Sequence, residues 1–193
     1  MSRIVVTEFM SLDGVIEDPG GAEGFAHGGW SFEFRDPEGM QYKLQETLDH
    51  DALLLGRVTY EGFAAAWPSM TDEVGFAEKM NGMPKFVVSS TLDELEWNNS
   101  TLIQGNLAEE VAKLKQRPGG DILVAGSATL VRGLMAEGLV DEYRLMVFPI
   151  VLGSGKRLFG ETEDTATLKL VGSKTLDSGT LILTYHPVVE TGS

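Results

Sequence analysis

Short apolar runs alternate with longer amphipathic segments along the first three quarters of the chain. The apolar runs predict strands at residues 3–10, 51–55, 85–88, 101–103, 121–125 and 141–151. Apolar side chains at helical spacing predict helices at residues 38–48, 57–66, 106–115 and 127–136. Met40, Leu44 and Leu48 recur every fourth residue, so we expect them to form the apolar stripe of the first helix.

The last quarter of the chain has a different pattern. Residues 168–176 and 180–185 alternate apolar and polar side chains, and the Asp-Ser-Gly sequence at 177–179 is typical of a hairpin turn. Strands that alternate with helices and end in a hairpin predict an α/β fold, with a mostly parallel sheet that has an antiparallel edge and is covered by helices. We expect one domain over residues 1–187 and a frayed polar tail at 188–193.

A long glycine-rich loop, residues 11–30, follows the first predicted strand. Loops of this length inside a compact domain are usually functional or disordered, and the apolar residues of this one favour partial order. Two roles fit Trp30 near its end: a packing anchor, or a platform that stacks on a planar substrate.

Composition narrows the class of protein. The chain has 15 Lys and Arg against 29 Asp and Glu, and a net charge of −14 repels polyanions, so we expect no nucleic-acid partner. Cysteine is absent, the first apolar run is too short for a signal peptide, and no apolar stretch could span a membrane, so we expect a cytoplasmic protein. His27, His50 and His186 share no metal-ligand spacing, so we expect no metal site.

Two predicted strand-to-helix turns carry the strongest chemical signal. Gly56 follows one apolar run and opens a helix, and Gly126 does the same after another run. A helix N-terminus presents unpaired N–H groups, and glycine lets a phosphate approach the backbone. Two readings stay open: ordinary capped turns, or a phosphate site shared by both. Arg57 fits either a surface salt bridge or a grip on a phosphate.

Five short motifs occur in a fixed order, namely SLDG at 11–14, LGRVTYE at 55–61, VSS at 88–90, GSATL at 126–130 and PIVLGSGKRLF at 149–159. Together, over residues 3–186, they resemble the dihydrofolate reductase superfamily. The resemblance is closest to the C-terminal reductase domain of bifunctional riboflavin biosynthesis proteins. It implies a dihydrofolate-reductase-like fold with three layers, α/β/α.

The resemblance also implies NADPH as the cofactor. Gly56, Arg57 and Thr59 would hold its phosphates, with Arg57 favouring NADPH over NADH. The other implied cofactor contacts are Val15 and Ile16 beside the nicotinamide, Ser89 and Ser90 at the adenosine end, and Gly126, Ser127, Ala128, Thr129 and Leu130 around the pyrophosphate. The implied border of the substrate pocket is Gly153, Ser154, Gly155, Lys156 and Phe159.

The resemblance is incomplete at the catalytic acid. Dihydrofolate reductases carry a buried acid on the first helix, and in the matching region here Glu38 lies one turn from the expected place. In the riboflavin branch the acid near the nicotinamide corresponds to Asp13, which makes Asp13 the catalytic candidate. A turn-forming Asp–Gly pair is the other role that fits this residue.

The favoured function is therefore an NADPH-dependent reductase of a small heterocyclic metabolite, resembling 5-amino-6-(5-phosphoribosylamino)uracil reductase. The alternatives are a non-catalytic dimeric NADP-binding module and a dihydrofolate reductase. We also expect a homodimer, because the strand at 141–151 and the C-terminal hairpin offer an edge and an apolar face, and related domains commonly pair there.

Overall fold

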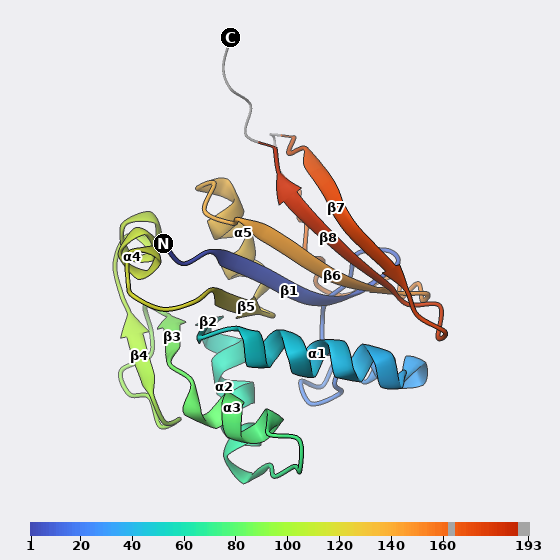
Figure 1. Ribbon diagram of the computed structural model, residues 1–193, viewed down its shortest axis with the longest axis horizontal. Coiled ribbons are helices and arrows are strands. Elements are labelled where there is room, and N and C mark those ends of the chain that lie inside the picture. Colours follow the sequence, from blue (N-terminus) through green and yellow to red (C-terminus); the bar gives the residue numbers. More distant parts are fainter. Residues whose placement is uncertain (162–164, 189–193) are drawn as a thin grey trace.

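The computed structural model describes residues 1–161 and 165–188, and within them eight strands form one sheet in the order β4-β3-β2-β5-β1-β6-β8-β7 (Figure 1). The strands are β1 (Ile4–Ser11), β2 (Ala52–Gly56), β3 (Lys85–Val88), β4 (Ser100–Ile103), β5 (Ile122–Ala125), β6 (Glu142–Phe148), β7 (Leu168–Thr175) and β8 (Leu181–Pro187). The helices are α1 (Pro37–Asp49), α2 (Arg57–Ala66), α3 (Phe76–Gly82), α4 (Leu107–Lys115) and α5 (Ala128–Ala136), with 3-10 turns η1 (Trp30–Phe34) and η2 (Trp67–Ser69).

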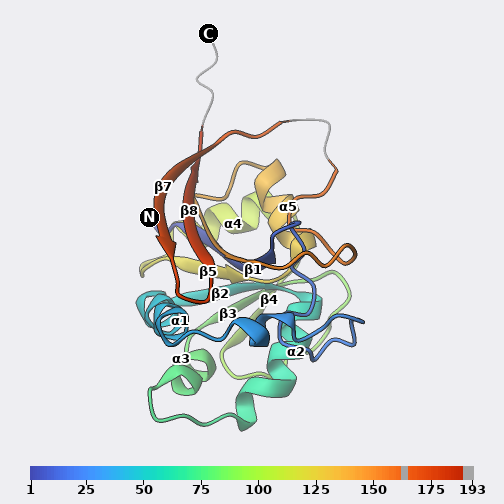
Figure 2. The ribbon, with the colours of Figure 1, turned by 90° about the vertical axis from the view of Figure 1, so that its right-hand side faces the viewer.

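The topology confirms the predicted fold class. Strands β1 to β6 pair in parallel, whereas β8 pairs antiparallel with β6 and β7 pairs antiparallel with β8. Helices α1, α2 and α3 cover one face of the sheet, and α4 and α5 cover the other (Figure 2). The result is the expected three-layer α/β/α arrangement.

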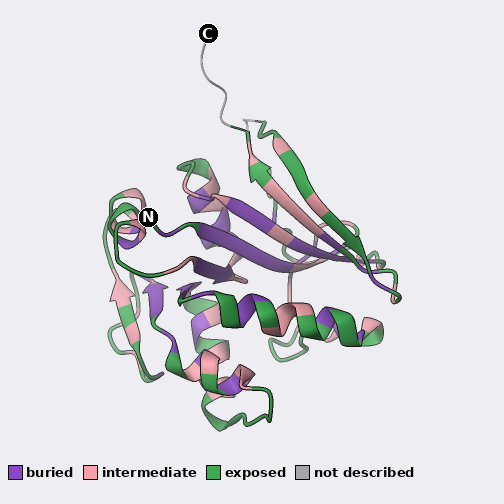
Figure 3. Cartoon of the chain, in the orientation of Figure 1, coloured by how far each residue is buried: buried purple, intermediate pink, exposed green. Residues whose placement is uncertain are grey.

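Side-chain alternation along β1 separates the two faces of the sheet. Ile4 and Val6 pack in the largest apolar cluster, which includes side chains of α4 and α5, whereas Val5 packs with side chains of α2 and α3. Figure 3 shows the central strands β1 and β6 largely buried and the outer strand β7 largely exposed. A third cluster, centred on Trp30 and Phe148, lies beside the hairpin.

The two neighbours of β1 end at different levels. Pairing between β1 and β5 stops at Thr7 opposite Ala125, but pairing between β1 and β6 continues to Ser11 opposite Phe148. The last part of β1 therefore runs on beyond the end of β5. This leaves a gap in the sheet on the β5 side of β1, beyond Thr7. The gap lies at the carboxyl ends of the parallel strands, which is where open α/β sheets bind ligands.

The apolar stripe expected on the first helix is not the face that the helix buries. Met40 is 66% exposed, and the buried residues of α1 are instead Gly39, Glu46 and Thr47. The sheet beneath the helix is polar at this point: the Thr7 hydroxyl donates to Glu46 Oε2 (2.9 Å). Polar groups under α1 need polar partners, so the side chains that α1 buries against the sheet at this point are polar.

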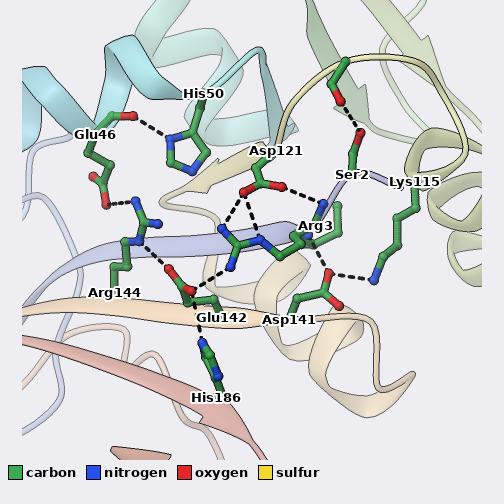
Figure 4. A network of polar contacts seen from close by, with 12 residues as sticks. Ser2, Arg3, Glu46, His50, Lys115, Asp121, Asp141, Glu142, Arg144 and His186 are labelled. Atoms are coloured by element: carbon green, nitrogen blue, oxygen red, sulfur yellow. Dashed lines mark hydrogen bonds and ion pairs between the residues drawn. The ribbon is translucent and has the colours of Figure 1, made fainter. Parts of the chain in front are cut away.

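A chain of ion pairs continues this polar layer across the sheet (Figure 4). Arg144 lies between Glu46 (3.7 Å) and Glu142 (2.6 Å), both of which are buried. Glu142 also pairs with Arg3 (3.0 Å), and Arg3 pairs in turn with Asp121 (2.6 Å). This series of ion pairs links the start of β1 with α1 and β6, and its two buried carboxylates, those of Glu46 and Glu142, each have a cation beside them.

Some elements differ from the prediction. Helix α3 and both 3-10 turns were not predicted, because each is short and lacks a clear apolar period. Strand β6 ends at Phe148 and lies between β1 and β8, so it offers no free edge; the free edge on that side belongs to β7. Of the predicted tail, residues 189–193 lie outside the described residues. No helix in the described part of the chain is long and apolar enough to cross a bilayer.

Candidate functional site

The two glycine turns meet at the carboxyl edge of the sheet. The Ser127 hydroxyl accepts a hydrogen bond from the Gly56 amide (2.8 Å) and donates one to Thr59 Oγ1 (2.8 Å). A Cβ on Gly126 would lie 2.9 Å from Thr59 Oγ1, so only glycine fits there without a shift. The structure therefore brings the two predicted phosphate turns into one site.

Two helix N-termini open at this site. Neither α2 nor α5 is capped by a described side chain, so the first-turn amides of both helices can donate to a ligand. Ser127 holds the left-handed conformation (φ 67°), which non-glycine residues rarely adopt. Strain of this kind clusters at ligand sites, and the paired helix dipoles favour an anion.

The candidate residues of the second turn contribute in different ways. Thr129 is exposed, whereas the side chains of Ala128 and Leu130 are buried in the core. Contacts from Ala128 and Leu130 to a ligand can therefore come only from their backbone amides. At the first turn, Arg57 is half exposed and pairs with Glu61 on the next helical turn (2.9 Å). An exposed pair of this kind is weak, so the guanidinium is available to a phosphate.

The serines after β3 differ from each other. Ser89 is buried, and its hydroxyl accepts hydrogen bonds from the amides of Thr91 and Leu92 (both 3.1 Å). Ser90 is exposed. Ser89 thus shapes the turn, and of the two hydroxyls that of Ser90 is presented to solvent at the sheet edge.

The loop after β1 is fastened to the segment after β6. The Leu12 amide donates to the Ile150 carbonyl (2.8 Å), and the Ile16 amide donates to the Lys156 carbonyl (2.8 Å). Val15 is fully buried and forms an isolated antiparallel bridge with Arg157. Two predicted candidate segments, 13–16 and 153–156, are thereby brought side by side.

The Asp13 carboxylate forms part of this fastening. It accepts hydrogen bonds from the Ser11 hydroxyl (2.7 Å) and from the amides of Leu152 (3.1 Å) and Gly153 (2.8 Å). These bonds, led by that of Ser11, lower its pKa to about 2. A proton donor works best with a pKa near the working pH, so this environment suits an anion that ties loops together. The catalytic role of Asp13 stays a prediction.

The predicted substrate residues spread over the same end of the molecule. Trp30 is 3% exposed, donates from Nε1 to the Glu17 carbonyl (2.9 Å), and lines a cavity of about 330 Å³. Gly153, Ser154 and Lys156 are exposed, and Phe159 lies 6.1 Å from the ring of Tyr143. Gly155 is half buried against Val15.

A larger cavity, of about 680 Å³, lies between α1 and the sheet. Its apolar lining includes Phe9, Met40, Leu44, Met146 and Phe148. Sequence reasoning missed this cavity, although the stripe of Met40 and Leu44 was the available signal. Two polar residues of its lining form contacts within the protein: Asp36 caps α1, and Lys43 donates to the Thr7 hydroxyl.

Glu8 is a second feature that sequence reasoning missed. It lies in β1, is 5% exposed, and its Oε1 has no hydrogen-bond partner among the described residues. Burial raises its pKa to about 8, although the Lys43 charge and the Gly126 amide act in the opposite direction. The signal was an acid inside an otherwise apolar run.

Comparisons of sequence agree with this architecture. The model of the RibD C-terminal domain family matches residues 2–182. The uncharacterized protein YyaP of Bacillus subtilis is 34% identical over 188 residues, which cover 95% of this chain and 94% of that protein.

Solved structures show the same fold. A putative riboflavin biosynthesis protein from Shewanella sp. PV-4 superposes with a TM-score of 0.78 at 24% identity, covering 97% of this chain and 99% of that one. A dihydrofolate reductase from Enterococcus faecalis, complexed with NADP(H), superposes with a TM-score of 0.63 at 18% identity, covering 97% of both chains.

Proposed function

Because the chain belongs to the RibD C-terminal domain family, we propose that it is an NADPH-dependent reductase of a small heterocyclic metabolite. The observation that carries the proposal is the joining of two uncapped helix N-termini through Gly56, Thr59 and Ser127. A dinucleotide carries two adjacent phosphates, and two converging sets of amides suit them.

The residues present fit NADPH. The amides at the starts of α2 and α5 would hold the pyrophosphate, and Arg57, released from Glu61, would pair with the 2′-phosphate. The dihydrofolate reductase of E. faecalis, which shares the fold, was solved with NADP(H). When bound, NADPH would supply a hydride; the protein's part is to hold the substrate beside it and keep water out.

The apolar cavity beside α1 is the proposed substrate site. It shares Phe9 with the part of β1 that runs on past β5, and so borders the gap in the sheet. Its aromatic lining favours a planar ring. The fastened loops at 11–16 and 150–158 close the same end of the molecule.

A titration with NADPH and NADH tests the cofactor. Wild-type protein should bind NADPH more tightly than NADH, and Arg57→Ala should weaken NADPH binding about tenfold, the effect of losing one charge-assisted contact of about 1.4 kcal/mol. NADH binding should change little. Lys113→Ala, an exposed cation on α4 paired with Glu110, is the matched control. Equal affinity for the two cofactors in wild type would contradict the proposal.

A second candidate function is a dinucleotide-binding module without efficient catalysis. The contacts of Asp13 favour it, because hydrogen bonds from Ser11, Leu152 and Gly153 hold its carboxylate as an anion that ties the loops together. Oxidation of NADPH, followed at 340 nm with a panel of pyrimidine and pteridine compounds, separates the two. Turnover of any compound supports the reductase, whereas binding without turnover across the panel supports the module.

The proposal includes a homodimer. Strand β7 is one edge of the sheet, and Leu170 and Val171 are exposed on it. Sedimentation at micromolar concentration should give twice the 20.9 kDa chain mass. A monomer would refute this part and leave the cofactor proposal intact.

A further inference from the structure

Glu8 is an acid on an apolar face. Side chains alternate along β1, so Glu8 points to the same side as Ile4 and Val6, which belong to the largest apolar cluster. Its neighbour on β6 is Leu145, from the same cluster. A carboxyl group in such surroundings costs free energy, and an apolar side chain there would not. The fold alone therefore gives no reason for an acid at this position.

The position of Glu8 coincides with the gap in the sheet. Thr7 is the last residue of β1 that pairs with β5, and its partner Ala125 is followed directly by Gly126. Glu8 is thus level with the Gly126 turn and on the α5 side of β1, the strand that lies between β5 and β6 (Figure 1). A dinucleotide with its pyrophosphate on the two helix N-termini would pass this point with its nicotinamide.

One carboxyl oxygen remains free for that ligand. Oε1 is buried and unpartnered among residues 1–161 and 165–188, while the Gly126 amide acts on the carboxyl group. Buried polar groups are almost always paired, so an unpaired one beside a ligand site indicates a partner that arrives with the ligand.

We propose that the Glu8 carboxyl contacts the nicotinamide end of the bound cofactor and discriminates between its oxidised and reduced forms. This inference rests on the proposed function. The oxidised nicotinamide ring carries a positive charge and the reduced ring does not. A carboxylate beside the ring favours the cation, so Glu8 should strengthen NADP⁺ binding relative to NADPH binding.

Other charged groups on the elements around Glu8 are already paired. Lys43 on α1 bonds Thr7 and Glu46, Arg144 on β6 pairs with Glu46 and Glu142, and Arg132 on α5 donates to the carbonyls of Arg157 and Leu158. These charges are the same in wild type and in Glu8→Gln, so their effect on the ratio of the two affinities cancels in the comparison. A change in the ratio of the two affinities therefore reports on Glu8.

Glu8→Gln keeps the size of the side chain and removes its charge. Calorimetric titration of the full chain at about pH 9 should show the ratio Kd(NADP⁺)/Kd(NADPH) rising about tenfold over wild type, equivalent to about 1.4 kcal/mol. Glu78→Gln, an exposed acid on α3, is the control and should leave the ratio unchanged. A ratio in Glu8→Gln equal to that of wild type overturns the inference, because a purely structural acid would affect both forms alike.

Proton release on binding, measured on wild type, tests the same contact if Glu8→Gln does not fold. At about pH 7.5, titrations in two buffers of different ionisation enthalpy should show NADP⁺ binding releasing more protons than NADPH binding, by up to about one. Equal release refutes the contact. Failure of wild type to bind either form refutes the proposed function instead.

Discussion

The joining of the two glycine turns can be measured with a double-mutant cycle. Ser127→Ala removes the hydroxyl that links Gly56 with Thr59, and Thr59→Val removes the other hydroxyl of the pair. If the hydrogen bonds act as one unit, the double variant should lose less stability than the sum of the single variants. The cycle therefore tests the geometry on which the proposed cofactor site depends.

The structure sets the expected magnitudes. Ser127→Ala breaks two hydrogen bonds of 2.8 Å each, and Thr59→Val breaks one of them. At about 1 kcal/mol per bond, the single variants should lose about 2 and about 1 kcal/mol, and the double variant about 2, which gives a coupling of about 1 kcal/mol. With a urea m-value of about 2 kcal/mol/M, the midpoint of Ser127→Ala should fall by about 1 M.

Urea unfolding followed by tryptophan fluorescence is a suitable assay, because Trp67 and Trp97 pack beside α2. Ser173→Ala, on the exposed side of β7, is the control and should change stability by less than about 0.5 kcal/mol. Losses that add up to within about 0.3 kcal/mol would refute the reasoning, since they would mean that the hydroxyls of Ser127 and Thr59 act independently.

Three further variants test the loops and the aromatic cluster. Asp13→Asn should lower the free energy of unfolding by about 1 kcal/mol at pH 7. Because the folded pKa of Asp13 is lowered to about 2, the difference in stability from wild type should be present above about pH 4 and fade as the pH falls through 2. A difference in stability that persists in acid would contradict this. Gly155→Ala places a Cβ 2.7 Å from Val15 Cγ1 and should lower stability by about 2 kcal/mol more than Gly153→Ala, which has a similar left-handed backbone but open space, as checked by urea unfolding. Phe148→Ala removes edge contacts to two aromatic rings and should cost about 3–5 kcal/mol in the same assay; a cost under 1 kcal/mol would mean that this cluster is not a true core.

The fold could be predicted from the sequence because local and long-range signals agree. The apolar runs that became β2, β3 and β5 are buried on both faces, as parallel strands are, and β2 and β5 are each followed by a helix with its own stripe. The hairpin of β7 and β8 follows from alternation and turn residues. Each signal depends on neighbouring residues, so a single sequence was enough.

The site could be predicted only in part. Gly56 and Gly126 were identifiable because each stands at a strand end, but the hydrogen bonds of Ser127 depend on how β2 and β5 lie next to each other. The apolar stripe of α1 was identifiable, but its place beside a cavity was not, because periodicity shows which side of a helix is apolar and not what that side meets. Glu8 was missed because burial of a charge is a property of the assembled sheet.

The two faces of α1 have different roles: one attaches the helix to the sheet, and the other lines the cavity. One face, with Glu46, attaches the helix to the sheet by ion pairs and hydrogen bonds, and the other, with Met40 and Leu44, lines the cavity. Substitutions of Met40 and Leu44 therefore leave the attachment intact, whereas Lys43 both lines the cavity and bonds Thr7. The shape of the cavity can therefore be changed at Met40 and Leu44 without altering the ion pairs that hold the helix on the sheet.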